Sequence, residues 1–240
     1  MRRLTGAACV AAACLSAVPA LAQYDGGVRA TVEAASEERR RGLSWSGGDP
    51  VLRATSSAPV GAGFGVEAAA ATLRGGARHG GADAVVDLGG TYSQRIGGWR
   101  LSAEGRYHLF PGASGHGYGD IGAGAGFTIG PASIDMFASY APRQRSIGGD
   151  NLYLAAYGAA GIPGTPLTLS AHVGRSSGAV RDPVRAARLR PEKVYWDHGI
   201  GIDYLRGRWF AGLRYADTDI ETPGARHAGA SLIGRAGLSF

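Results

Sequence analysis

Apolar and polar residues alternate with a period of two along much of this chain of 240 residues. The clearest example is residues 99–109, WRLSAEGRYHL, in which odd positions are aromatic, aliphatic or small and even positions are polar or charged. Successive side chains of a β-strand point to opposite faces, so this segment predicts a strand with one apolar and one charged face. Helical spacing, with apolar residues three or four positions apart, is hard to find. The alternation therefore predicts an all-β protein.

The alternating segments are each about ten residues long and are separated by turns rich in glycine, proline and aspartate. There are about 12 of them, an even number of the kind that single-chain bacterial barrels require. The expected strands are residues 27–37, 50–57, 62–73, 83–95, 98–109, 118–129, 131–141, 150–160, 165–174, 194–206, 208–216 and 227–240.

Short and long connections alternate between these segments. Tight hairpin composition occurs at Gly97-Gly98, Gly130-Pro131 and Pro163-Gly164. Tight turns at one end and longer loops at the other are typical of outer-membrane barrels. We therefore predict an antiparallel transmembrane outer-membrane β-barrel. The longer polar connections are residues 112–117, 143–150, 176–192 and 217–226.

The first 22 residues have the composition of a cleaved signal peptide. Arg2 and Arg3 precede an apolar stretch, and Ala20-Leu21-Ala22 suits an A-x-A cleavage site. We expect residues 23–240 to form a single barrel domain. A lipoprotein signal around Cys14 is the competing interpretation. Both cysteines of the chain precede residue 23, so no disulfide is expected in the barrel.

The last expected strand alternates up to Phe240, with Ala230, Leu232 and Leu238 on the apolar face. A terminal phenylalanine on an alternating strand resembles the recognition signal read by the barrel-assembly machinery. The sequence therefore predicts location in the cell outer membrane, with the assembly machinery, outer-membrane lipid and lipopolysaccharide as partners. An ordinary strand that happens to end in phenylalanine is the alternative.

The formal net charge is +6, and the basic residues are dispersed among acidic ones instead of clustered. This dispersion argues against a nucleic-acid partner. Beyond the signal region no apolar run approaches the 18 residues of a helical membrane span.

Charged residues on the polar faces are expected to line the lumen of the barrel. Two arrangements remain open. Arginines along one wall would form a constriction with a weak anion preference, whereas arginines paired with carboxylates would rigidify and plug the lumen. The lumen candidates are Asp87, Arg100, Glu104, Arg106, Asp135, Asp197, Asp203, Arg214 and Arg235.

Large aromatic residues near the strand ends are expected at the membrane interface, where barrels carry aromatic girdles. Core aromatics of a soluble sandwich would look similar. The interface candidates are Trp99, Tyr107, Tyr140, Trp196 and Trp209.

No motif predicts an enzyme. His172 lies near Ser170 and Ser176, but the local sequence lacks the His-x-Ser-Asn arrangement of outer-membrane lipid A deacylases. The six histidines are scattered and form no metal-binding pair, so no metal or other cofactor is expected. The glycine-rich stretch at residues 122–126 lacks a following helix and reads as a strand.

Two short motifs give the chain a family likeness. Residues 36–50, SEERRRGLSWSGGDP, resemble the opening signature of the TorF family of porin-like proteobacterial proteins. The matching positions are Ser36, Arg41, Gly42, Ser44, Ser46 and Pro50. Glu38 stands where that family has an aromatic residue. Residues 107–112, YHLFPG, look like the family's Tyr-x-Tyr-Pro-Gly turn, with Phe110 replacing a tyrosine. The resemblance implies an outer-membrane barrel.

The function expected from the lumen is passive diffusion of small hydrophilic solutes across the outer membrane. A barrel of about 12 strands lies between small barrels filled by side chains and sixteen-stranded porins with open channels. The strand number therefore does not decide whether the lumen is open or plugged. The alternative is a non-conducting structural or adhesive barrel whose loop at residues 176–192 binds lipopolysaccharide or a partner. That loop carries Arg181, Arg185, Arg188 and Arg190.

Overall fold

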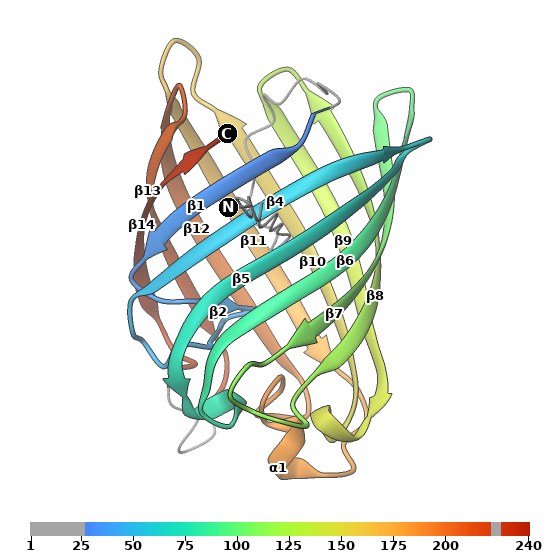
Figure 1. The fold of residues 1–240 in the computed structure, drawn as a ribbon. Coiled ribbons are helices and arrows are strands. Elements are labelled where there is room, and N and C mark those ends of the chain that lie inside the picture. Colours follow the sequence, from blue (N-terminus) through green and yellow to red (C-terminus); the bar gives the residue numbers. More distant parts are fainter. Residues whose placement is uncertain (1–26, 222–226) are drawn as a thin grey trace, which may run out of the picture.

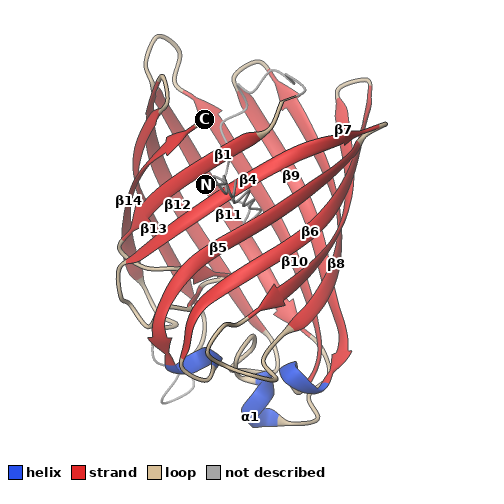
Figure 2. Cartoon of the chain, in the orientation of Figure 1, coloured by secondary structure: helices blue, strands red, loops and turns tan. Residues whose placement is uncertain are grey.

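The computed structural model describes residues 27–221 and 227–240. In this part of the chain, twelve antiparallel strands close into a single barrel, which confirms the predicted fold class (Figure 1, Figure 2). The expected signal peptide lies outside the described residues. The barrel strands are β1 (Arg29–Ala35), β4 (Val51–Gly61), β5 (Phe64–Gly76), β6 (Ala82–Ile96), β7 (Trp99–Leu109), β8 (Tyr118–Ile129), β9 (Ala132–Gln144), β10 (Gly149–Gly161), β11 (Leu167–Ser177), β12 (Tyr195–Arg206), β13 (Trp209–Thr218) and β14 (Ser231–Ser239).

The first and last strands close the barrel. Val32 of β1 lies opposite Leu238 of β14 on one side and opposite Ala54 of β4 on the other. Each remaining strand pairs with its neighbours in the sequence. Each barrel strand is therefore hydrogen-bonded to a neighbouring strand along both of its edges, as a barrel in lipid requires.

The two ends of the barrel differ in their connections. Short turns, such as those at Gly97 and Gly207, lie at the end that also holds the C-terminus (Figure 1). We call this the turn end. The opposite loop end carries the short helices η1 (Ala77–His79), η2 (Arg145–Ile147) and α1 (Pro183–Ala186), drawn blue in Figure 2.

The outer wall of the barrel is apolar. Val32, Ile121 and Leu154 are 49%, 61% and 43% exposed, and all three point away from the lumen. Exposed aliphatic residues on every second position are expected of a wall that faces lipid. No helix among the described residues is long and apolar enough to span a membrane.

One segment departs from the up-and-down plan. Residues 36–50, which we call the inserted segment, connect β1 to β4 and form the small hairpin of β2 (Arg39–Arg40) and β3 (Leu43–Ser44). Leu43 and Trp45 of this hairpin are buried. The side chains of the hairpin contact inward-facing residues of several strands, so the segment occupies the lumen at the loop end.

Candidate functional site

Two arginines fix the inserted segment to the barrel wall. Arg40 Nη1 lies 2.8 Å from Asp87 Oδ2 of β6. Arg41 Nη2 lies 3.1 Å from Asp120 Oδ2 of β8 and donates a hydrogen bond of 3.1 Å to Ser139 Oγ of β9. Guanidinium groups suit such contacts because they stay charged and donate several hydrogen bonds in fixed directions. The segment is therefore tied to three strands of one wall.

The acidic residues before these arginines complete the attachment. Glu38 lies 2.7 Å from Arg40 Nε and 3.3 Å from Arg53 Nη1 of β4. Glu37 accepts a hydrogen bond from Ser231 Oγ at the start of β14. The attachment thus reaches the strands next to the seam as well.

Gly42 allows the tip of the hairpin to touch the opposite wall. Its φ is +74°, and a Cβ at this position would overlap Thr218 and lie 2.7 Å from Asp197 Cβ. Only glycine combines this left-handed conformation with so close an approach. The Arg41-Gly42 pair shared with the TorF motif therefore has a structural role in seating the hairpin.

A small hydrophobic core closes the loop end of the barrel, between the hairpin and the loops. The Trp45 ring lies 4.2 Å from the His79 ring and 5.7 Å from the Phe110 ring, measured between centroids. The Arg40 guanidinium stacks over Trp45 at 4.3 Å. Leu43 and Tyr195 pack into the same core. The loops and the inserted segment therefore form one packed cap.

His79 is a neutral member of the cap. Arg188 Nη2 lies 3.2 Å from His79 Nδ1, so the guanidinium donates to an unprotonated nitrogen. Burial, together with the positive charges of Arg188 and Arg78, holds the pKa of His79 well below its ordinary value. Burial also lowers the pKa of Arg188 to about 10, which leaves this group charged at neutral pH.

His108 lies between the two carboxylates that hold the segment and is hydrogen-bonded to one of them, Asp87. Its Nδ1 lies 2.6 Å from Asp87 Oδ1, and its Nε2 lies 3.6 Å from Asp120 Oδ2. Neither His108 nor Asp120 was among the predicted lumen residues. Their positions on the polar faces of residues 98–109 and 118–129 were the signal available.

A cavity with a volume of about 170 Å³ lies in the lumen, on the side of the hairpin that faces the turn end. It is rich in positive charge, because seven arginines and four carboxylates line it. Tyr153, Tyr157 and His172 add flat ring surfaces. The charged lining residues are Glu33, Glu37, Glu38, Arg39, Arg40, Arg41, Arg53, Arg106, Asp197, Arg214 and Arg235.

The predicted lumen residues all lie on the inward faces of their strands, and most of them are ion-paired. Arg235 contacts Asp203 at 2.8 Å and Glu33 at 3.2 Å. Arg106 lies 2.9 Å from Glu104 Oε1. Their role in conduction stays a prediction.

Two further pairs complete the predicted lumen set. Nearer the turn end, Arg100 pairs with Asp135 at 2.6 Å, and the Arg100 side chain remains 54% exposed. Asp197 is fully buried, accepts a hydrogen bond of 3.1 Å from Tyr153 and lies 3.2 Å from His172 Nε2. Arg214 differs from the other predicted lumen arginines, because it makes no ion pair within the described residues.

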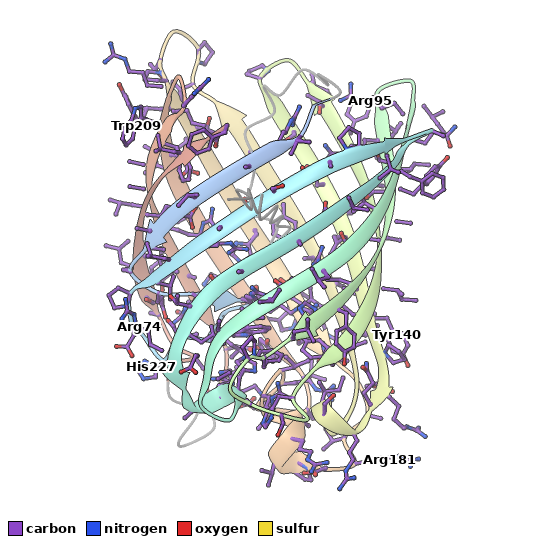
Figure 3. The ribbon with its side chains drawn as sticks, in the orientation of Figure 1. Arg74, Arg95, Tyr140, Arg181, Trp209 and His227 are labelled. Carbon is purple, nitrogen blue, oxygen red and sulfur yellow. The ribbon has the colours of Figure 1, made fainter. Side chains whose placement is uncertain are left out.

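The predicted interface aromatics point outward in two groups. Trp99 and Trp209 are 46% and 67% exposed and lie beside the tight turns, as Figure 3 shows for Trp209. Tyr107, Tyr140 and Trp196 lie toward the loop end, where Figure 3 labels Tyr140. This spacing suits two girdles, and contact with lipid headgroups stays a prediction.

Phe240 follows β14 and is 59% exposed. Its backbone N–H donates a hydrogen bond of 2.8 Å to Ala30 O at the start of β1. The last residue therefore belongs to the seam of the barrel. Its role as an assembly signal stays a prediction.

Three solved structures with this fold are two porins and an outer membrane channel. The NanC porin aligns with a TM-score of 0.62 and 12% identity, covering 88% of this chain and 98% of that chain. The KdgM porin gives 0.57 and 7% identity, with the same coverage. An outer membrane channel from Pseudomonas putida F1 gives 0.54 and 11%, covering 95% of this chain and 100% of that chain. With sequence identities this low, the structural alignments establish a shared fold alone.

Sequence comparison gives the family. No curated protein sequence matches the chain. The TorF name suggested by the motifs is not confirmed. Residues 22–234 match the family described as "Bacterial protein of unknown function (Gcw_chp)", and the chain belongs to that family.

Proposed function

We propose that this protein is an outer-membrane channel for passive diffusion of small hydrophilic solutes, with a weak anion preference. The observation that carries the proposal is a polar, arginine-rich lumen inside a closed barrel whose outer wall is apolar. The excess of arginine over carboxylate in the lumen cavity favours anions, because rings and walls of fixed charge select ions of opposite sign.

The inserted segment is the constriction of this channel. It is held at the loop end by exchangeable contacts, chiefly the ion pairs of Arg40 with Asp87 and of Arg41 with Asp120. No covalent bond joins the segment to the wall in the described residues. Movement of residues 36–50 would therefore change the conducting area without unfolding the barrel.

A non-conducting barrel is the second candidate, and the packed cap favours it. Leu43, Trp45 and Phe110 form a core that water would have to disrupt to pass. The adhesive form of this candidate loses support, because Arg188 and Arg190 are only 6% and 3% exposed and do not face outward. Arg181 and Arg185 remain at the surface, and Figure 3 shows Arg181 at the loop end.

The experiment is a reversal-potential measurement in planar bilayers under a potassium chloride gradient. We expect discrete conductance steps and a potential of the sign given by chloride preference. Arg235→Gln should weaken the preference, whereas Arg181→Gln, which changes a loop outside the lumen, should leave it intact. Silence from a barrel that heat-modifiable gel mobility shows to be folded would support the non-conducting candidate.

A further inference from the structure

Arg214 of β13 lacks the ion pair that the other predicted lumen arginines have. In residues 27–221 and 227–240 its guanidinium makes no hydrogen bond or salt bridge, although Asp203 and Glu33 lie close enough to stabilise its charge. Both carboxylates are held by Arg235, at 2.8 and 3.2 Å. Arg214 is therefore a cation in the lumen with its donors unused by the protein.

Glycine in the wall beside Arg214 makes room for the side chains of its neighbours. Gly201 of β12 lies opposite Arg214 in the ladder and opposite Ser170 of β11 on its other side. A Cβ on Gly201 would lie 2.9 Å from Ser170 Oγ and 3.6 Å from Arg214 Nε. The missing side chain makes room for the Ser170 hydroxyl, and Ser170 and Arg214 both line one part of the lumen cavity, which we call the recess.

Gly199 makes room for the ring of His172, and both residues line the cavity on the side of the recess nearer the cap. A Cβ there would lie 2.6 Å from His172 Cε1, so the imidazole occupies the space that a side chain at position 199 would need. Tyr157 stacks on His172 with 5.7 Å between ring centroids and 22° between ring planes. The recess thus has a cationic end at Arg214, a hydroxyl at Ser170 and a flat wall at His172 and Tyr157.

We infer that the recess around Arg214 is a saturable binding site for a small carboxylate solute. A guanidinium binds a carboxylate through two parallel hydrogen bonds, and Ser170 Oγ can donate a further one. The cavity volume of about 170 Å³ holds on the order of a dozen water molecules, which limits the ligand to a compact organic anion. The inference rests on the proposed function, because the solute reaches the recess through the lumen.

Binding is measured by isothermal titration calorimetry on the folded protein in detergent, with succinate as the probe and its uncharged diamide, succinamide, as the comparison. We expect succinate to bind with saturation and succinamide not to bind. Arg214→Gln should weaken succinate binding roughly tenfold, as expected for losing a charge-assisted hydrogen bond. Arg100→Gln is the matched control, because Arg100 is a lumen arginine paired with Asp135 outside the cavity.

A second variant, Arg214→Lys, keeps the charge and lacks the planar fork. It should fold as the parent does and bind succinate with intermediate affinity. Unchanged affinity in Arg214→Gln, equal loss in Arg100→Gln, or equal binding of succinamide would overturn the site. Preferential binding of inorganic phosphate over succinate would overturn the carboxylate assignment.

The two proposals fail separately. A folded barrel that binds succinate but carries no current would overturn the channel and leave the site. A barrel that conducts but shows no saturable binding would overturn the site and leave the channel.

Discussion

Arg40 of the inserted segment and Asp87 of β6 form a buried ion pair, with 2.8 Å between Nη1 and Oδ2 and less than a tenth of either side chain exposed. Burying two charges is costly unless each is paired and hydrogen-bonded. Both conditions are met, because Glu38 lies against Arg40 and His108 against Asp87. The pair therefore specifies where the segment lies more than it stabilises the barrel.

Breaking this pair from one side should leave an uncompensated charge. We expect Arg40→Gln to lower the free energy of unfolding by about 3–5 kcal/mol, and a double-mutant cycle with Asp87→Asn to give a coupling of about 0.5–3 kcal/mol. Tryptophan fluorescence during urea unfolding in lipid vesicles measures both. The exposed pair Arg185–Asp182, with side chains 41% and 45% exposed, is the control and should couple by less than about 1 kcal/mol. Equal coupling of the two pairs would show that the lumen pair is not desolvated.

Gly42 should tolerate substitution less well than a glycine with the same backbone strain and open surroundings. Gly97 has a φ of +60° and no atom within 4 Å of the point that a Cβ would occupy, whereas a Cβ on Gly42 meets Asp197 and Thr218. We expect Gly42→Ala to lower the free energy of unfolding by at least about 1 kcal/mol more than Gly97→Ala, because overpacking adds to strain. Urea unfolding of the two variants decides this, and equal losses would mean that the hairpin tip does not touch the wall.

The cap should loosen as the pH falls. Burial and Arg188 depress the pKa of His79, so the unfolded cap binds a proton below about pH 6.5 while the folded cap stays neutral. The contribution of neutral His79 to the stability of the cap is therefore fully present above that pH and is lost as the pH falls below it. The protection factors of residues 77–81, which correct the observed exchange rates for the intrinsic pH dependence of amide exchange, should be lower at about pH 5.5 than at about pH 7.5. His79→Gln, which does not titrate, should flatten this dependence, and an unchanged slope in the variant would contradict the assignment to His79.

Depth-dependent quenching by brominated lipids tests the aromatic girdles. Variants that keep one tryptophan each should show Trp99 and Trp209 quenched by bromine near the headgroups of one leaflet. Trp196 should be quenched from the other leaflet. Trp45, which is 3% exposed inside the cap, should be protected and is the internal control. Quenching of Trp209 by bromine at the bilayer centre would contradict the placement of the turn end at an interface.

The barrel could be predicted from the sequence because strand alternation is a local property. Residues 99–109 and 118–129 each reveal their faces without reference to any other segment. The expected strands coincide with the observed ones, and their ends differ by a few residues at most sites, as at β4, which runs on to Gly61.

The inserted segment could not be predicted in this way. Its sequence, SEERRRGLSWSGGDP, reads as a polar connection, and its position depends on partners far away in the chain. Arg41 and Asp120 are 79 residues apart. The burial of Arg188 and Arg190 was missed for the same reason, because a loop rich in arginine is usually exposed.

Residues 36–50 should restrict an otherwise conducting lumen, and removing them tests this directly. Ala35 and Val51 lie opposite each other at the ends of β1 and β4, so an Asn-Gly turn can replace the whole segment and still join the two strands. Single-channel conductance of this shortened protein is compared with that of the parent in planar bilayers. We expect a clear increase in conductance from a barrel with unchanged heat-modifiable mobility. An equally folded barrel with unchanged or absent conductance would contradict the proposed constriction.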